Sequence, residues 1–356
     1  MSTVYFANTS AKNKKSLLEK VEILAENAGI KNIIEKDELV AVKVHFGERG
    51  NTGFVSPIFV RRVVGKIKEA GGRPFVTDAN TLYKGSRGNA VSHIETALQN
   101  GFSYTTVEAP IIISDGLNGH DYQEIKVNGK HHKSVKISSA AASADALVVI
   151  SHFKGHEMAG FGGALKNIGM GLGSPGAKQV MHSDAKPKVN LEACTACKRC
   201  VKWCPKDAIT ISERAEIDPS KCYSCGECTV SCISNAISIE WGGDPNATTE
   251  RIVEHAAGTM KGKQEKSLFF NFLMNITPDC DCWGWSDSYI ISDIGVLAST
   301  DPVAIDTASL DMVNKAAGKD IFKEISPAVP DNRAQLKYAQ EMGIGSMKYE
   351  LKKLNI

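Results

Sequence analysis

Eight of the ten cysteines form a tandem repeat in the middle of the chain. The first unit has the spacing C-x-x-C-x-x-C-x-x-x-C and consists of Cys194, Cys197, Cys200 and Cys204. The second unit has the same spacing, starts 28 residues later, and consists of Cys222, Cys225, Cys228 and Cys232. The residues that follow repeat as well, as CPKDAITIS and CISNAISIE. We interpret the segment as the duplication of one structural unit that is specialised for sulfur chemistry.

The composition and the N-terminal residues predict where the protein works. Hydrophobic residues make up 42% of the chain and charged residues 23%, which is ordinary for a globular protein. A formal net charge of +2 gives no reason to expect nucleic acid or an anionic membrane as a partner. The first residues, MSTVYFANTSAKNKK, lack the apolar core of a signal peptide, and the apolar stretch 267–276 is too short to span a bilayer. We therefore expect a cytoplasmic protein with no membrane span.

In a reducing compartment, thiols at this density are metal ligands or catalysts more often than disulfides. Structural zinc is one alternative, because it also favours C-x-x-C pairs. Zinc takes four ligands as two pairs, however, whereas triplets with a remote fourth cysteine, present twice, match [4Fe–4S] clusters. The segment closely resembles two-cluster bacterial ferredoxins, in which the fourth cysteine of each unit ligates the other cluster.

The resemblance to ferredoxins implies a ligand set for each cluster. The first cluster is expected on Cys194, Cys197, Cys200 and Cys232. The second is expected on Cys222, Cys225, Cys228 and Cys204. Pro205 follows the ferredoxin pattern, whereas Ile233 stands where a second proline is usual, a change that removes no sulfur. The resemblance makes the segment an electron relay, and we expect oxygen sensitivity and an anaerobic host.

The flanking sequence alternates apolar strands with helices. We expect strands at 38–47, 73–80 and 144–155, and a helix at 57–72 that is closed by glycine. Strands that alternate with helices predict an α/β fold, with a mostly parallel sheet covered by helices on both faces.

Two linkers, at 182–190 and 241–250, are expected to bracket the cysteine repeat. We therefore predict an inserted α+β two-cluster ferredoxin-like domain at 188–241, with both of its ends near one point of the α/β domain. The α/β domain is then divided into 1–187 and 242–356.

The stretch after the third expected strand, SHFKGHEMAGFGGALKNIGMGLGSPGAKQVMH, contains the richest set of catalytic residue types. Open α/β sheets bind ligands beyond the carboxyl ends of their strands. Gly162 and Gly163 allow a close backbone approach, and the helix start next to Lys166 is suited to an anion. The alternative is that the glycines only form tight turns and that His152 and His156 are solvated loop residues.

Four motifs together resemble the family called domain of unknown function 362, in its ferredoxin-bearing branch. The resemblance covers almost the whole chain and implies an iron–sulfur protein. The motifs are VKVHFGERGNTGFV (42–55), HFKGHEMAGFGGALKNIGMG (152–171), CDCWGWSD (280–287) and DIGVLASTDPVAIDTASLD (293–311).

A second, local resemblance concerns HEMAGFGGALK, which is similar to a segment of the nickel-pincer lactate racemases. It implies that His156 is an acid/base, that Lys166 tethers a cofactor and that His182 lies where those enzymes bind nickel. The racemase signature D-x-T-R-P is absent. The resemblance therefore locates a site, with an additional metal or an anionic ligand near Lys166.

Three further groups are candidates for the same site. Cys280 and Cys282 form a C-x-C pair among aspartates, which fits a metal site, thiol redox chemistry or a tight turn with a buried sulfur. A disulfide is disfavoured, because closure across one residue is strained. His45 ends an expected strand and is a candidate proton donor, with a core or surface position as the alternative. Asp301 reads first as a helix N-cap that precedes Pro302 at the first helical position.

Two functions from different classes follow. In the first, the protein is an oxidoreductase, a ferredoxin-dependent reductase that passes electrons from a redox partner protein through both clusters to a small-molecule substrate. In the second, it is a non-catalytic electron carrier, or a cluster- or metal-delivery partner for another enzyme. The candidate catalytic residues are His45, His152, His156 and Lys166. The candidate cofactor-binding residues are Lys166, Gly162, Gly163, His182, Cys280 and Cys282.

The two cysteine units differ in charge. Basic residues crowd the first unit: Lys198, Arg199, Lys202 and Lys206. The second unit carries Glu227 instead. This asymmetry fits a protein in which an acidic electron donor docks at the first unit and the second unit faces the α/β domain. It is equally well explained if the basic residues only keep the protein soluble.

Overall fold

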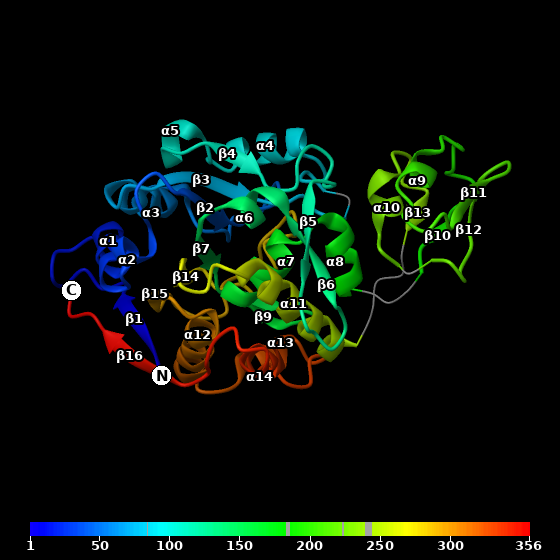
Figure 1. Ribbon diagram of the computed structural model, residues 1–356. Coiled ribbons are helices and arrows are strands. Elements are labelled where there is room, and N and C mark those ends of the chain that lie inside the picture. The colour runs from blue at the N-terminus through cyan, green and yellow to red at the C-terminus, as the bar shows by residue number, and fades with distance from the viewer. Residues whose placement is uncertain (84, 183–185, 223, 239–243) are drawn as a thin grey trace.

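Within the residues that the computed structural model describes (1–83, 85–182, 186–222, 224–238 and 244–356), eight strands form a central sheet (Figure 1). In their order across the sheet they are β16 (Tyr349–Lys353), β1 (Ser2–Asn8), β15 (Gly295–Ser299), β14 (Ser267–Leu273), β7 (Ala146–His152), β2 (Leu39–Val44), β3 (Arg73–Asp78) and β4 (Ile111–Ile113). Neighbouring strands are parallel except at β15, which runs antiparallel to β14 and to β1. The predicted mostly parallel sheet is confirmed.

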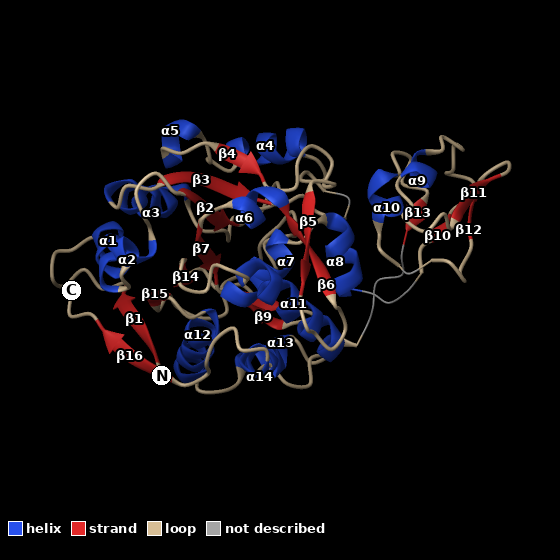
Figure 2. Cartoon of the chain, viewed as in Figure 1, coloured by secondary structure: helices blue, strands red, loops and turns tan. Residues whose placement is uncertain are grey.

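Helices cover both faces of this sheet, as predicted (Figure 2). Leu147 and Val149 of β7 enter one apolar core, whereas Val148 and Ile150 enter the other. Because both sides of the strand are buried, its sequence is a continuous apolar run. The first core is completed by α7 (Ala164–Leu172), α11 (Pro245–Met260), α12 (Pro302–Ala317) and α14 (Ala334–Glu341), and the second by α1 (Leu17–Asn27), α3 (Pro57–Glu69) and α4 (Ala90–Gln99).

The expected elements are present with changed boundaries. The helix expected at 57–72 is α3, and Gly71 after it has a φ of +95°, so the predicted closure by glycine is confirmed. The strand expected at 144–155 is interrupted, because β7 ends at His152. The chain then leaves the sheet and forms a small hairpin from β8 (Lys154–His156) and β9 (Gly160–Gly162).

The apolar stretch 267–276 forms β14 in the middle of the sheet. Phe269 enters the first core, and Phe270 and Phe272 enter the second. In the described ranges, no helix is both long and apolar enough to cross a bilayer. The remaining elements of the α/β part are α2 (Ile30–Ile33), α5 (Tyr104–Val107), α6 (Ser139–Ser143), α8 (Pro175–His182), α13 (Ile321–Ile325), β5 (Tyr122–Lys126) and β6 (Ser134–Ser138).

The cysteine segment lies beside α8, at one end of the molecule (Figure 1). Its elements are β10 (Lys188–Val189), α9 (Arg199–Lys202), β11 (Ile209–Ile211), β12 (Ala215–Ile217), α10 (Glu227–Ser231) and β13 (Ile237–Ser238). β10 pairs with β13 in antiparallel orientation, with Lys188 opposite Ser238. The two ends of the segment therefore lie side by side.

The two cysteine units share one backbone conformation. Each unit has left-handed residues at three equivalent positions, which are Ala196, Lys198 and Asp207 in the first unit and Ser224, Gly226 and Asn235 in the second. Left-handed backbone at non-glycine residues is uncommon, so its recurrence at the same 28-residue offset reflects a repeated fold. The short helices α9 and α10 also begin at equivalent positions, Arg199 and Glu227.

The expected linkers fall partly outside the described residues, at 183–185 and 239–243. The second linker was predicted to extend to residue 250, and this boundary is wrong. Helix α11 begins at Pro245, and the carboxylate of Asp244 caps it by accepting the backbone N–H of Asn246. An Asp–Pro pair is a favourable helix start, because proline lacks the N–H that has no partner at the first helical position.

Candidate functional site

A cavity of about 700 Å³ lies at the carboxyl ends of β2, β3 and β7. This is where open α/β sheets bind ligands, and the volume suits a small molecule. Asp301 does not line it, whereas the candidate catalytic and cofactor-binding residues all do: His45, His152, His156, Gly162, Gly163, Lys166, His182, Cys280 and Cys282. The structure thus brings together residues that lie on three distant parts of the sequence.

Cys280 lies on the cavity wall. The residue is buried, with 3% exposed, and Lys166 Nζ donates to its sulfur at 3.7 Å. Interaction with Cys282 holds the pKa of Cys280 well below its ordinary value, and the ammonium groups of Lys154 and Lys166 lower it further against the effect of burial. Interaction with Cys280 and burial raise the pKa of Cys282 well above its ordinary value.

Lys154 and Lys166 approach Cys280 across the β8–β9 hairpin. Burial disfavours the ammonium form of Lys154, but the sulfur of Cys280 and the carboxylate of Asp281 outweigh burial and raise the pKa of this lysine. A Cβ atom at Gly162 would lie 3.2 Å from Lys154 Nζ and 3.3 Å from Lys166 Cδ. Glycine at this position leaves room for both lysines.

His156 and His182 line the cavity near Cys280. His156 Nδ1 accepts the backbone N–H groups of Met158 at 3.2 Å and Ala159 at 3.1 Å. This arrangement assigns the ring proton to Nε2, and the side chain hydrogen-bonds to Cys280. Burial and the nearby His156 together lower the pKa of His182 to about 3, so His182 is neutral at the end of α8.

The other two candidate histidines also line the cavity, and their catalytic roles stay predictions. His152 Nδ1 lies 3.0 Å from a carboxylate oxygen of Asp281, and its Nε2 lies 3.1 Å from the carbonyl oxygen of Met274. Both of its nitrogens are engaged, so it fixes the loop of Asp281. His45 Nδ1 accepts the N–H of Gly47 at 3.0 Å, and burial keeps its pKa well below the ordinary value. His45 is therefore a neutral imidazole at the cavity.

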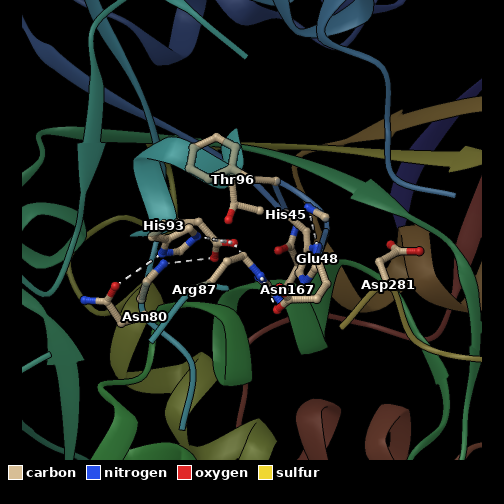
Figure 3. Close-up of polar contacts among 12 residues, drawn as sticks. His45, Glu48, Asn80, Arg87, His93, Thr96, Asn167 and Asp281 are labelled. Atoms are coloured by element: carbon tan, nitrogen blue, oxygen red, sulfur yellow. Dashed lines mark hydrogen bonds and ion pairs between the residues drawn. The ribbon is translucent and has the colours of Figure 1, made fainter. Parts of the chain in front are cut away.

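A buried ion network forms another wall of the cavity (Figure 3). Asp78 Oδ1 lies 3.0 Å from Lys43 Nζ, and Asp78 Oδ2 lies 3.4 Å from Arg87 Nη1. Arg87 Nε reaches Glu48 Oε2 at 3.3 Å, and Lys43 Nζ donates to Asn167 Oδ1 at 2.6 Å. Burial opposes the charge of Asp78, but Lys43 and its other partners hold its pKa well below the ordinary value.

This network was missed in the sequence. Asp78 ends β3, beside the end of β2 that carries Lys43, so a strand-end aspartate was the available signal. The sequence around Arg87 has no pattern that indicates its role. Arg87 lies in a loop, and folding brings it to Glu48 and Asp78. Since the charges neutralise one another, the network supplies a rigid wall.

The start of α7 is not free for an anion, contrary to the sequence prediction. Asp306 of α12 accepts the backbone N–H groups of Ala164 at 2.7 Å and Leu165 at 2.9 Å. A Cβ atom at Gly163 would lie 2.3 Å from Asp306 Oδ1, so glycine makes this contact possible. Asp301 accepts the N–H groups at the start of α12, as predicted for an N-cap.

Sulfur atoms of the two cysteine units influence one another. Burial raises the pKa of Cys228, and the sulfurs of Cys225, Cys222, Cys200 and Cys204 raise it further. Burial also raises the pKa of Cys200, and so do the sulfurs of Cys232 and Cys197. The two units therefore lie against each other, and the assignment of each cysteine to one cluster stays a prediction.

Hydrogen bonds to sulfur repeat in both units. The N–H of Ala208 donates to Cys204 Sγ at 3.2 Å, and the N–H of Ala236 donates to Cys232 Sγ at 3.2 Å. Among the described residues, no group of three or more metal-binding side chains converges on a single ion. The thiolates around a [4Fe–4S] cluster bind separate irons, so they need no common point, and the donor set fits such clusters.

The second cysteine unit docks on the α/β part through Glu227. This side chain is 5% exposed, and its carboxylate lies 2.8 Å from His120 Nδ1 and 2.6 Å from Lys136 Nζ. The ring of Trp203 stacks on His120, with centroids 3.7 Å apart. These contacts attach the segment to the loop before β5 and to β6.

Helix α8 is the other docking surface. A Cβ atom at Gly176 would lie 2.8 Å from the carbonyl oxygen of Cys225, so the cysteine loop closely approaches the helix. Thr229 Oγ1 donates to Gln179 Oε1 at 2.5 Å. Lys178 and His182, on the same short helix, line the cavity. One helix therefore separates the second cysteine unit from the cavity.

The model for the family described as "Domain of unknown function (DUF362)" matches residues 40–311. The chain belongs to this family. The matched range includes the cavity residues and the whole cysteine segment. Among curated proteins, the search gave no match.

Two solved structures are similar to parts of this chain. The lactate racemase apoprotein from Thermoanaerobacterium thermosaccharolyticum has 13% sequence identity and a TM-score of 0.45, over 89% of this chain. A Thermotoga maritima protein solved by structural genomics has 11% identity and a TM-score of 0.37, over 91% of this chain. In each case this chain spans 58% of the length of the other protein.

Proposed function

We propose that this protein is an iron–sulfur oxidoreductase that passes low-potential electrons from the cysteine segment to a small molecule in the cavity. When bound, two [4Fe–4S] clusters supply one-electron transfer. The observation that supports this function is the position of α8, which touches the second cysteine unit on one side and lines the cavity with Lys178 and His182 on the other.

The orientation of the segment supports a direction of electron flow. Cys197 is exposed, and the basic side chains of the first unit are exposed around it. The second unit is turned inward, since Glu227 is buried against Lys136. We therefore assign the first unit to docking of an acidic redox partner protein and the second to the cavity.

The cavity residues are suited to an anionic or strongly polarised group. Lys154 and Lys166 bring two positive charges to Cys280. His156 adds a hydrogen-bond donor at Nε2 beside them. The density of cysteines fits a reducing compartment, and we place the protein in the cytoplasm.

The test starts with anaerobically purified protein, which is expected to contain iron and acid-labile sulfide. About two zinc ions and no sulfide would contradict the proposal. Next, two variants separate the functions: Cys200→Ser removes a cluster ligand, and Lys166→Ala alters only the cavity. An oxidoreductase requires both residues for its activity in cells. If Lys166→Ala retains full activity while Cys200→Ser abolishes it, the protein is an electron carrier without a reaction of its own.

A further inference from the structure

We infer that the cavity binds a planar aromatic molecule that carries an anionic group, with the ring against Trp283 and the anionic group on Lys166. The inference rests on the proposed function only in calling this molecule the substrate, because it concerns binding and requires no electron transfer. It begins from the two tryptophans of the motif CDCWGWSD (280–287), to which the proposed function gives no role.

Trp283 and Trp285 form a stacked pair beside the cavity. Their ring centroids lie 5.9 Å apart, and their ring planes differ by 19°. Trp283 is 46% exposed and Trp285 is 49% exposed, and Trp283 is the member of the pair that lines the cavity. The stack uses one face of Trp283 and leaves the other face for a ligand. A flat aromatic ring gains more on such a face than an aliphatic group of equal area.

The loop that carries both indoles is held in place by its backbone. Asn51 Nδ2 donates to the carbonyl oxygen of Trp285 at 2.9 Å. A Cβ atom at Gly50, where φ is +88°, would lie 2.4 Å from the carbonyl oxygen of Gly284, so the two loops touch through their main chains. A ligand therefore meets a preorganised surface and loses little binding energy in ordering it.

Further apolar side chains line the same cavity: Leu82, Tyr83, Met158 and Met170. A single exposed tryptophan is ordinary for a protein surface. Trp283, in contrast, adds to an apolar lining that contains few charged groups without a partner. Binding sites for small molecules combine such a lining with a small number of polar groups that orient the ligand.

Lys166 is the polar group that is suited to the anionic end of the ligand. Within the described ranges, its Nζ contacts the sulfur of Cys280 at 3.7 Å and no carboxylate. Lys154 Nζ, in contrast, lies 3.8 Å from Asp281 Oδ2, and Lys178 Nζ donates to three backbone carbonyl oxygens. An ammonium group has three N–H donors, so one sulfur leaves donors of Lys166 for a ligand.

A single turn connects the two ends of the proposed site. The N–H of Trp283 donates to the carbonyl oxygen of Cys280 at 3.1 Å, and the side chain of Cys280 contacts Lys166. Trp283 and Lys166 both line the cavity of about 700 Å³. One small molecule can therefore reach both side chains.

The test measures binding to anaerobic holoprotein by calorimetry, with three probes of similar size. The first probe, 2-naphthoate, is planar and anionic. The second, 2-naphthamide, is planar and neutral, and the third, decahydro-2-naphthoate, is anionic but not planar. Wild type is expected to bind 2-naphthoate about 10- to 100-fold more tightly than the amide, because a charged hydrogen bond is lost. The decahydro compound is expected to bind about 5-fold more weakly than 2-naphthoate.

Two variants assign these preferences to residues. Trp283→Leu is expected to weaken binding of both planar probes by about 10-fold, because stacking on the indole is lost. Lys166→Met is expected to abolish the preference for 2-naphthoate over the amide. Tyr289→Leu is the control, because Tyr289 follows on the same loop, is 52% exposed and does not line the cavity. It is expected to bind all three probes as wild type does.

The inference is overturned if folded wild type does not bind 2-naphthoate, if Trp283→Leu binds it as tightly as wild type, or if Lys166→Met keeps the preference for it. These results do not depend on the clusters. Protein that contains iron and sulfide but does not bind 2-naphthoate would refute this inference and leave the proposed function standing. Protein that binds the probes as expected but lacks iron and sulfide would refute the proposed function and leave this inference standing.

Discussion

The docking of the cysteine segment depends on Glu227, and Glu227→Gln tests it. The substitution keeps the shape of the side chain and removes its charge. In the structure the carboxylate meets His120 at 2.8 Å and Lys136 at 2.6 Å, and the side chains of the three residues are 5%, 11% and 18% exposed. We expect the segment to detach from the α/β part more often in this variant.

The free energy that the Glu227 contact contributes to docking follows from its burial. Breaking a fully buried ion pair costs about 3–5 kcal/mol, whereas an exposed pair contributes about 0.2–1 kcal/mol. The residual exposure of Lys136 and His120 places this contact between those limits, at about 2 kcal/mol. A loss of this size lowers the ratio of docked to detached segment by about 30-fold.

Hydrogen–deuterium exchange of the α10 amides measures this ratio. Protection of these amides is expected to fall by about 30-fold in Glu227→Gln, because exchange follows the open population. Glu213→Gln changes an exposed glutamate in the same segment and is the matched control. The proposed function requires that any electron transfer to the cavity fall in parallel. Unchanged α10 protection in Glu227→Gln would refute the assigned role of the ion pair.

The same contact predicts acid sensitivity. Burial raises the pKa of Glu227, but the hydrogen bond from His120 and the charge of Lys136 outweigh burial and leave the pKa below its ordinary value. A carboxyl group whose pKa is lower in the folded state stabilises it above the ordinary pKa, and this contribution disappears as the pH falls through the lowered pKa. Protection of α10 should therefore decrease in acid, and to a smaller extent in Glu227→Gln.

Four further substitutions test the α/β part. Gly163→Ala places a Cβ atom 2.3 Å from Asp306 Oδ1 and is expected to lower the stability of the folded protein by about 1–3 kcal/mol. A Cβ atom at Gly65 would meet nothing within 4 Å, so Gly65→Ala should stabilise α3 by about 0.5–1 kcal/mol. Thermal melts compare the two variants. Asp301→Ala removes the cap of α12 and should cost about 1 kcal/mol in urea unfolding, and a cost near zero would contradict the capping role. Burial lowers the pKa of Lys178 from 10.5 to about 8, so the unfolded chain binds more protons between these values and stability rises with pH there. Lys178→Met should flatten this rise by up to about 3 kcal/mol in denaturation curves at pH 8 to 10, and an unchanged slope would show that Lys178 is not the source.

Local patterns in the sequence were sufficient for several features. The cysteine spacing predicted a duplicated unit, and the structure repeats its left-handed residues at the same offset. Apolar runs predicted the central strands, because a strand buried on both faces needs apolar residues throughout. The stretch after β7 predicted the position of the cavity, since parallel strands place their carboxyl ends at one edge. Each of these patterns is contained within a few tens of residues.

Contacts between distant segments required the tertiary structure. Asp306 occupies the start of α7 from 142 residues away, and no spacing near Lys166 indicates that these amides already have a partner. Glu227 meets His120 across 107 residues. This contact makes the second cysteine unit face the α/β part, which the charge difference between the two units could not show by itself. Arg87 reaches the carboxylate of Glu48 across 39 residues. Sequence determines which groups a segment offers, but burial decides which of those groups must pair with each other, and burial exists only once the chain has folded.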